Sequence, residues 1–428
     1  WLITSGEIDN NILIAAHDRK VKVQLLDRTR GNDGVYRRHL ANRLEDPNLK
    51  SLAEVSLVAF LQEWLKAGSH RDREVAVFSL PDLWFSAGLT YLPGQALYLG
   101  KRPEEAVDID AALDAWRRFW TAEIPRLRPA GEDRGHAPMF KAFARRHLSM
   151  LANNIGVWLE DAGRPEAAYE AYGRARELEP DNISALLNQY VLAQADTNRV
   201  GRDEVIGRVD ELVRDGRRKA PVWSLARTYG YVRMPEAFAE IGLSWAMSGY
   251  PGMAVSGLRR AIELKGEQAP RMKQLLAAVY LAQDQPEQSA ELYGEVLAQA
   301  PENRNALFGL ARSRIVAGDY AGAGELLRRL EKLGASRERT ALEWVQIDLA
   351  TGEWDRARVQ LQELVELNPR NLSAWTLLAA LHYSRQDEAG LQECLKHLEQ
   401  AERPPFAGLI LQGLIAMDRQ RLENARRF

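Results

Sequence analysis

From residue 149 onward, small and apolar residues recur at helical spacing in a unit of about 34 residues. The first unit covers residues 149–182. Gly156 lies in its first helix, Ala168 and Ala175 lie in its second, and Tyr172 occupies the large position between them. Small residues allow two helices to pack closely, and a large residue fills the space that remains. The pattern therefore predicts a pair of antiparallel helices.

The same frame recurs toward the end of the chain. Gly, Asp or Pro stands in the short segments where one helix must end and the next begin. Between 183 and 234 the unit diverges, with a longer loop at 196–204 and an extra short helix near 222–230. We expect about seven to eight helix pairs over residues 149–428, the last one truncated. Later units begin near residues 235, 270, 304, 338 and 372, and the last contains Gly413 and Ala425.

These units resemble tetratricopeptide repeats. The resemblance implies a right-handed superhelical solenoid, whose concave groove is lined by the first helix of each pair and binds peptides, extended chains or partner helices. Some members hold the carboxyl terminus of chaperones through Asn and Lys. The matching positions of the first unit carry Asn153 and Val157, so the clamp is absent and chaperone tails are not the expected ligand.

Several positions on the first helices should face such a groove. Their arginines and amides could pair with an acidic or extended partner, and the alternative is a solvated face without a specific ligand. Four tryptophans on repeat positions are expected to serve packing instead: Trp158, Trp245, Trp344 and Trp375. The candidate partner-binding residues are Asn153, Arg271, Gln274, Asn305, Phe308, Arg312, Arg339, Gln346 and Tyr383.

Residues 1–103 lack the repeat. Short apolar runs at 1–4, 21–27 and 75–79 alternate with helical patterns, and a possible fourth strand lies near 95–100. Alternation of this kind predicts a small three-layer α/β domain with a parallel sheet. Residues 104–148 are predicted to form a helical bridge to the solenoid, which includes a polar loop at 126–138.

The α/β region offers one place for chemistry. Ser5, Gly6, Glu7 and Asp9 follow the first strand, where α/β proteins bind ligands, and Asp27 ends the second strand. A nucleotide-binding domain is thus one hypothesis. The turn has a single glycine and no P-loop lysine, however, and Ser5 and Asp9 could simply cap the helix. Five histidines show no metal-ligand spacing and are expected at the surface or in the core: His17, His39, His70, His136 and His147.

Charge and cysteine content limit the classes of function that the chain could have. The 57 basic and 59 acidic residues give a net charge of −2, which argues against nucleic acid as the main partner. The single Cys394 cannot form an internal disulfide and is expected to be a buried hydrophobic residue. No run is apolar enough over about 20 residues to predict a transmembrane helix. We expect no cofactor and no metal.

Residues 1–100 show a second, weaker resemblance. A strand, a turn reading Ser5-Gly6-Glu7-Ile8-Asp9-Asn10, a helix and the run VKVQLL are similar to the soluble region of bacterial envelope proteins that resemble protein O-mannosyltransferases. The turn in those proteins usually reads Asn-Gly-Asp-Asn, so this chain carries an insertion. The resemblance implies an upstream membrane half that holds any sugar-transfer chemistry, and an extracytoplasmic rather than cytoplasmic location. A first residue that is Trp1 and not Met fits a fragment.

The leading hypothesis is a non-catalytic scaffold, in which an α/β domain caps a solenoid that binds a partner protein or peptide in a larger assembly. The main alternative is the soluble extracytoplasmic part of a membrane glycosyltransferase-like protein. A third hypothesis is a nucleotide-binding α/β domain that acts on the solenoid.

Overall fold

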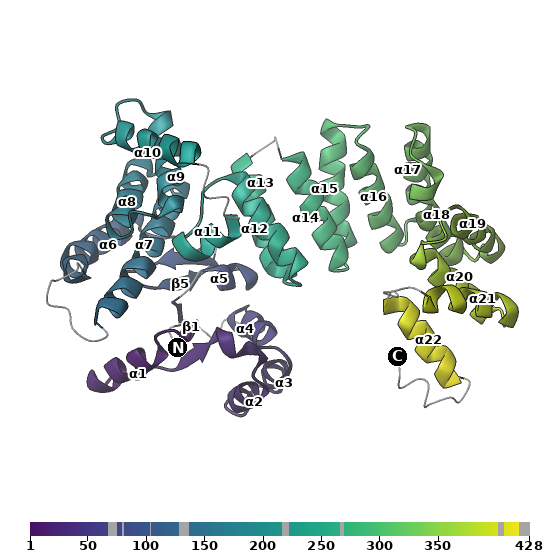
Figure 1. Cartoon of the computed structure of the whole chain (residues 1–428), viewed down its shortest axis with the longest axis horizontal. Coiled ribbons are helices and arrows are strands. Elements are labelled where there is room, and N and C mark those ends of the chain that lie inside the picture. Colours follow the sequence, from purple (N-terminus) through teal and green to yellow (C-terminus); the bar gives the residue numbers. More distant parts are fainter. Residues whose placement is uncertain are drawn as a thin grey trace. The chain divides into compact units, whose positions relative to one another are not determined.

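The computed structural model describes residues 1–66, 75–78, 81–102, 104–127, 137–215, 222–265, 269–400 and 406–418. The chain is mainly helical and forms two compact units, Trp1–Ala269 and Pro270–Phe428 (Figure 1). Unit 1 contains a five-stranded sheet and the first repeat helices, and unit 2 contains helix pairs. The division therefore falls within the predicted solenoid, because the early repeats pack with the sheet.

The sheet of unit 1 has the strand order β2-β1-β3-β5-β4. Its first three strands are parallel, as the alternating pattern predicts. Two further strands extend this parallel part, and β5 runs antiparallel to both β3 and β4. A tight turn in which the Gly94 N–H donates to the Leu97 carbonyl joins β4 to β5, and so short a connection allows only antiparallel pairing. The strands are β1 (Leu2–Thr4), β2 (Leu25–Asp27), β3 (Ala76–Val77), β4 (Thr90–Pro93) and β5 (Tyr98–Lys101).

The core of this domain forms around the sheet. Ile3 and Leu26 of the parallel strands are almost fully buried, as is Leu65 of α4. Trp84 packs so closely on Gly100 that an added Cβ would lie 2.3 Å from its ring, so only glycine fits there. The surrounding helical elements are α1 (Asp9–Asp18), η1 (Arg28–Asn32), α2 (Gly34–Ala41), α3 (Pro47–Val55), α4 (Leu57–Lys66) and α5 (Asp82–Ser86).

The remaining helices of unit 1 begin the repeat series. Helix α7 starts at residue 137 and continues through the expected boundary at 148–149. The extra short helix expected near 222–230 is α11. Gly156 of α7 lies against Tyr172 of α8, as the repeat frame predicts. These helices are α6 (Ile109–Glu123), η3 (Ile124–Leu127), α7 (Ala137–Asp161), α8 (Pro165–Leu178), α9 (Ile183–Ala195), α10 (Arg202–Asp215), α11 (Val222–Tyr229), α12 (Pro235–Met247) and α13 (Pro251–Lys265).

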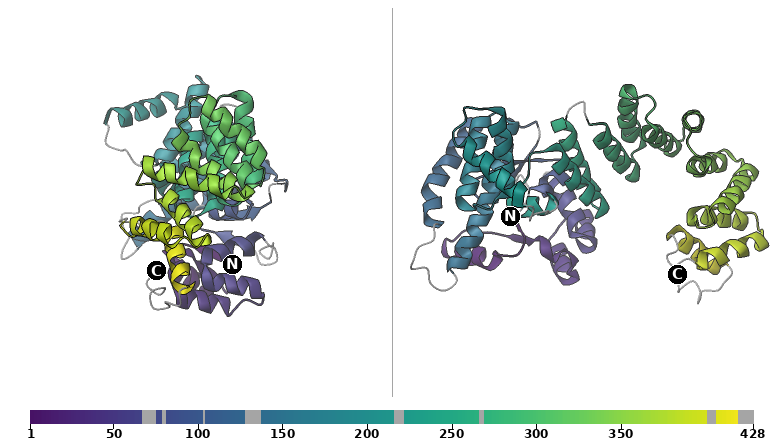
Figure 2. Two further views of the ribbon diagram at one scale, coloured as in Figure 1. Left: turned by 90° about the vertical axis from the view of Figure 1, so that its right-hand side faces the viewer. Right: turned by 45° about the horizontal axis from the view of Figure 1, so that its top comes forward.

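Unit 2 is a stack of antiparallel helix pairs that follow one another along a curve (Figure 2). Close contacts at small residues hold neighbouring helices together, since a Cβ added to Gly309 would lie 2.1 Å from the Tyr293 ring. The first helices of the pairs, called the A helices, are α14 (Pro270–Ala282), α16 (Arg304–Val316), α18 (Arg337–Thr351) and α20 (Leu372–Ser384). The B helices are α15 (Pro286–Gln299), α17 (Tyr320–Lys332), α19 (Trp354–Leu367) and α21 (Glu388–Glu399), and α22 (Phe406–Asp418) follows them.

None of the helices described is both long enough and apolar enough to cross a membrane. Cys394 is buried within the core of unit 2, and burial raises the pKa of its thiol to about 12. Its expected role as a buried hydrophobic residue is confirmed. Among the four repeat tryptophans, Trp375 is buried, and Trp158, Trp245 and Trp344 are half-buried.

Candidate partner-binding surfaces

Asparagines on α7 and α9 hold a segment of the chain's own backbone. The Nδ2 atoms of Asn153 and Asn188 both donate to the Tyr231 carbonyl at 2.9 Å. The Tyr231 N–H donates to Asn154 Oδ1 at 2.8 Å, and the Arg233 N–H donates to Asn188 Oδ1 at 2.7 Å. All three asparagines are buried. Together they form what we call the α7/α9 face, which binds backbone N–H and carbonyl groups rather than a side chain.

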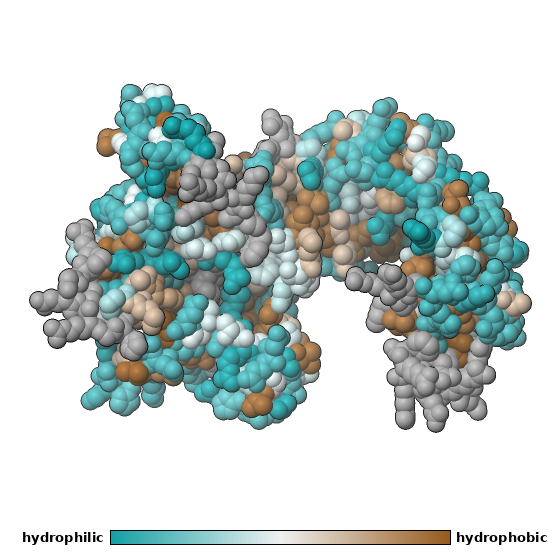
Figure 3. Space-filling view, viewed as in Figure 1, coloured by the Kyte–Doolittle hydropathy of each residue, from teal (hydrophilic) through white to brown (hydrophobic). Residues whose placement is uncertain are grey.

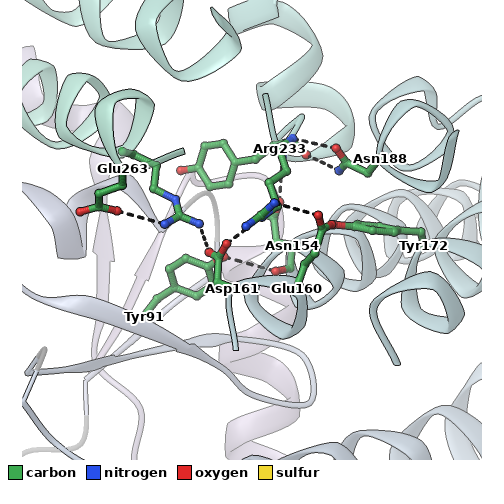
Figure 4. Close-up of polar contacts among 10 residues, drawn as sticks. Tyr91, Asn154, Glu160, Asp161, Tyr172, Asn188, Arg233 and Glu263 are labelled. Atoms are coloured by element: carbon green, nitrogen blue, oxygen red, sulfur yellow. Dashed lines mark hydrogen bonds and ion pairs between the residues drawn. The ribbon is translucent and has the colours of Figure 1, made fainter. Parts of the chain in front are cut away.

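The side chain of Arg233 anchors the same segment through ion pairs (Figure 4). Its guanidinium contacts Asp161 Oδ1 at 2.7 Å and Glu160 Oε1 at 2.8 Å. Arg260 of α13 also pairs with Asp161, and the Tyr172 hydroxyl donates to Glu160 Oε2 at 2.9 Å. Burial raises the pKa of Glu160, and Arg233 opposes that shift. The α7/α9 face is therefore already covered.

Asn153 does not lie where the sequence placed it. It was expected to face an open groove, and it is fully buried beneath Tyr231. Asn154 and Asn188, which sequence reasoning missed, share its role. The available signal was three amides on otherwise apolar stretches of α7 and α9, because buried amides must find hydrogen-bond partners.

On unit 2, by contrast, three of the expected residues of α16 and α18 are in contact at the surface. Arg339 Nη2 donates to Asn305 Oδ1 at 2.8 Å, and the Arg339 guanidinium lies 5.1 Å from the centre of the Phe308 ring. Asn305, Arg312, Arg339 and Gln346 are exposed, and Phe308 is half-buried. We call these five residues the α16/α18 surface.

A buried acid lies beside this surface. Glu343 is only 7% exposed, and its Oε1 atom lies 3.8 Å from Arg312 Nε. Burial raises the pKa of Glu343, while the charges of Arg312 and Arg339 act in the opposite direction. The carboxylate thus offsets part of the positive charge, while the Arg312 side chain stays exposed.

The other expected residues of unit 2 are more scattered. Arg271 is exposed on α14, and Gln274 is half-buried on the same helix. Tyr383 on α20 is half-buried and packs against the core formed by residues such as Trp375 and Leu378. We therefore assign Tyr383 chiefly to packing, and the α16/α18 surface remains the site where expected residues converge.

Charge divides strongly between the two kinds of helix in unit 2. The A helices carry seven basic and three acidic side chains, whereas the B helices carry six basic and eleven acidic ones. The surface over α17 and α19 is mainly hydrophilic (Figure 3). The charges of the A helices are Arg271, Lys273, Arg304, Arg312, Arg314, Arg337 and Arg339, against Glu338, Glu343 and Asp348.

The candidate residues after the first strand have structural contacts. Ser5 Oγ donates to Glu7 Oε2 at 3.2 Å, and Asp27 Oδ1 accepts from the Thr29 N–H at 2.9 Å as the cap of η1. Gly6 adopts a φ of 82° close to Asp27, a conformation that favours glycine. Asp9 opens α1, but the capping residue is Ile8 without a side-chain bond, so the alternative that Ser5 or Asp9 caps the helix does not hold.

The histidines divide as expected between surface and core. His17 and His39 are exposed, and His147 is buried against Phe78. His70 and His136 lie outside the described residues. Within the part of the chain that the structure describes, no three His, Cys, Asp or Glu side chains gather closely enough to bind a metal ion.

Comparisons with known proteins identify the repeats. Residues 280–342 and 342–390 match family models described as tetratricopeptide repeat, so these helix pairs are tetratricopeptide repeats. No curated protein matches the chain. Unit 2 thus belongs to a class of fold that is typical of protein-interaction scaffolds.

Similar solved structures have low identity. A tetratricopeptide repeat protein from Parabacteroides merdae is 16% identical, with 65% of this chain and 89% of that chain covered and a TM-score of 0.41. The Pseudomonas aeruginosa pilF structure is 19% identical, with 45% and 87% covered and a TM-score of 0.36. Yeast Tom70 is 13% identical, with 90% and 74% covered and a TM-score of 0.32. Likeness at this level carries no argument about function.

Proposed function

We propose that unit 2 is a non-catalytic scaffold that binds an extended, acidic segment of a partner protein on its A helices. The observation that carries this proposal is the division of charge, with a basic excess on the A helices and an acidic excess on the B helices. A partner of negative charge is attracted to one face and repelled by the other, which selects both the partner and its side of approach.

The α16/α18 surface supplies contacts of three kinds. Arg312 and Arg339 offer guanidinium donors, which pair well with carboxylates. Asn305 and Gln346 are exposed amides that could bond to a partner's backbone. Phe308 provides an apolar platform beneath Arg339. This combination suits an extended chain better than a small molecule.

The α7/α9 face supports the same mode of binding. There, amides on two first helices hold an extended run of backbone through the carbonyl and N–H of Tyr231. Helix pairs of this kind can therefore bind an extended chain through its backbone, whatever its side chains. Unit 2 has comparable amides together with arginines.

Binding of labelled acidic peptides to the full chain tests the proposal. We expect a Glu-rich peptide of about a dozen residues to bind by fluorescence anisotropy, and a Lys-rich peptide of equal length and apolar content not to bind. Added salt should weaken the complex, because its attraction is largely between exposed charges. Arg312→Gln with Arg339→Gln should weaken binding about tenfold or more through the loss of charge-assisted hydrogen bonds.

The choice of glutamine follows from Glu343. Replacement of either arginine by glutamate would place a second carboxylate beside this buried acid and destabilise the fold. Lys332→Gln with Arg370→Gln is the matched control, because both are exposed and lie outside the A helices. Equal binding of both peptides, or equal loss in the two double variants, would contradict the proposal.

The alternative, a soluble extracytoplasmic part of a membrane glycosyltransferase-like protein, stays a prediction of the sequence. The weak resemblance of residues 1–100 to such proteins is its sole support. The mass of the intact polypeptide in alkali-washed membranes of cells that make it tests this alternative, which requires a polypeptide well above 48.2 kDa.

A further inference from the structure

Unit 1 contains a crevice of about 620 Å³ at the carboxyl ends of its parallel strands. Ser5 follows β1, Arg28 follows β2 and Phe78 follows β3, and all three line it. Among the three parallel strands β1 is the middle one, so the chain leaves it toward β2 on one side and later enters β3 on the other. Crevices at such reversals are where open α/β sheets bind ligands, and the volume suits a small molecule.

Positive groups reach this crevice from three separate elements. Arg28 comes from the sheet edge, Arg146 from α7 and Arg227 from α11. Arg146 and Arg227 are exposed. Burial lowers the pKa of Arg28, the charge of Asp82 opposes that shift, and Arg227 adds a smaller lowering, so all three side chains face the same space. Three arginines and two acids, Glu7 and Asp82, line the crevice, so its lining keeps a net positive charge that favours an anion.

The crevice also contains two acids. Asp82 is buried, accepts a hydrogen bond from the Tyr231 hydroxyl and offsets part of the charge of Arg28. Glu7 accepts from Ser5 at the beginning of α1. A carboxylate repels an anion, so a negatively charged group would bind on the arginine side of the crevice.

Aromatic rings form another part of the lining. Phe78 stacks on His147 with 3.9 Å between ring centres, and Trp245 meets Tyr250 edge to face at 5.4 Å. All four rings line the crevice. The site thus combines arginines for a charged group with flat apolar surfaces for a ring or other apolar body.

We propose that this crevice binds a small organic phosphate, with the phosphate group held by Arg28, Arg146 and Arg227 and the remainder packed against the aromatic wall. Three guanidinium groups from different elements match the several oxygens of a phosphate better than the two of a single carboxylate. The bound ligand would join the sheet to α7 and α11. The crevice belongs to unit 1, so its test is independent of the partner-binding proposal for unit 2.

Thermal unfolding of the full chain with simple probes tests the site. We expect inorganic phosphate to raise the melting temperature of unit 1 more than chloride does at equal ionic strength, because a ligand of the folded state stabilises it by mass action. Adenosine 5′-monophosphate should bind about tenfold more tightly than phosphate through stacking of its base. Adenosine and sodium acetate at equal concentration should give much smaller shifts.

Variants separate a real site from a general effect of salt. Arg146→Gln with Arg227→Gln should abolish the response to both phosphate probes while the protein stays folded, since both side chains are exposed. Arg118→Gln is the matched control, because Arg118 is exposed on α6 and does not line the crevice. No shift with either phosphate probe, or an equal shift in the double variant, overturns the proposal. A shift with acetate as large as that with phosphate overturns the preference for phosphate.

Discussion

The α7/α9 face and the α16/α18 surface are built on equivalent helices, but the first is buried and the second is exposed. Both contain polar side chains on neighbouring first helices of repeat pairs. In unit 1 these side chains are buried and bonded to the chain's own backbone near Tyr231, whereas in unit 2 they are exposed. A polar residue on a first helix is thus no sign of an open binding site by itself. What decides is whether another part of the chain covers it.

The largest expected effect is a difference in unfolding free energy between the same amide substitution made in each region. Asn154→Leu leaves the Tyr231 N–H without its acceptor and the Tyr98 hydroxyl without its donor, both of them buried. We expect a loss of about 2–5 kcal/mol in the free energy of unfolding, measured by urea denaturation with circular dichroism. The matching change in unit 2, Asn305→Leu, is at an exposed position and should change it by less than about 0.5 kcal/mol.

Hydrogen exchange would locate the loss. Amide protons around residues 229–233 should exchange faster in Asn154→Leu, because this segment loses its anchor. If the two leucine variants cost the same, the distinction between a covered and an open face would be wrong.

A second, smaller effect should be common to both regions, because the packing between helices follows the same rule. Gly156→Ala places a Cβ 2.4 Å from the Tyr172 ring, and Gly309→Ala places one 2.1 Å from the Tyr293 ring. Each should cost about 1–3 kcal/mol by overpacking, measured by the same denaturation.

Gly294→Ala is the control for those substitutions. Gly294 lies inside α15 with nothing within 4 Å of an added Cβ. Alanine should therefore stabilise unit 2 by about 0.5–1 kcal/mol, the usual gain in helix propensity. Stabilisation by alanine at Gly156 or Gly309 would show that the close approach of helix and ring is not required.

The smallest effect is a dependence on pH that belongs to unit 1. Burial lowers the pKa of His147 below its usual 6.5. Below pH 6.5 the unfolded chain therefore binds the proton more readily than the folded chain, and stability falls as the pH falls. Relative to His147→Gln, which keeps a donor for the Ala96 carbonyl, the natural protein should lose about 1 kcal/mol between pH 7 and pH 5.5.

Comparison with the glutamine variant is needed because nearby acids act with the opposite sign. Burial raises the pKa values of Asp82 and Glu160, so their contribution to stability grows as the pH falls through the raised values toward the unfolded ones. Parallel pH profiles of the natural protein and His147→Gln, measured by thermal unfolding, would contradict the assignment to His147.

The helix pairs could be predicted from the sequence because each depends on residues close in the chain. Gly156 and Tyr172 belong to adjacent helices, and their contact follows from the spacing of small and large residues alone. The convergence of Asn305, Arg312 and Arg339 was accessible for the same reason, since one repeat length separates Asn305 from Arg339.

What the sequence could not show depends on distant contacts. Asn154 and Tyr231 are 77 residues apart, so no local pattern reveals that the α7/α9 face is covered. The crevice likewise needs Arg28, Arg146 and Arg227, which only the folded unit brings to one place. A strand near β5 was expected, but its hairpin partner β4 was missed because a strand of 4 residues is too short for a clear alternating pattern.

The α7/α9 face can be covered only after the ribosome has produced the segment around Tyr231. At about 5–20 residues per second, the ribosome needs roughly 4–15 s after Asn154 to produce Tyr231. During that interval α7, α8 and α9 can emerge and pair, but their asparagines have no backbone to hold. The nascent chain therefore displays an open groove that the finished protein conceals, and a competing peptide would have access to it only during translation.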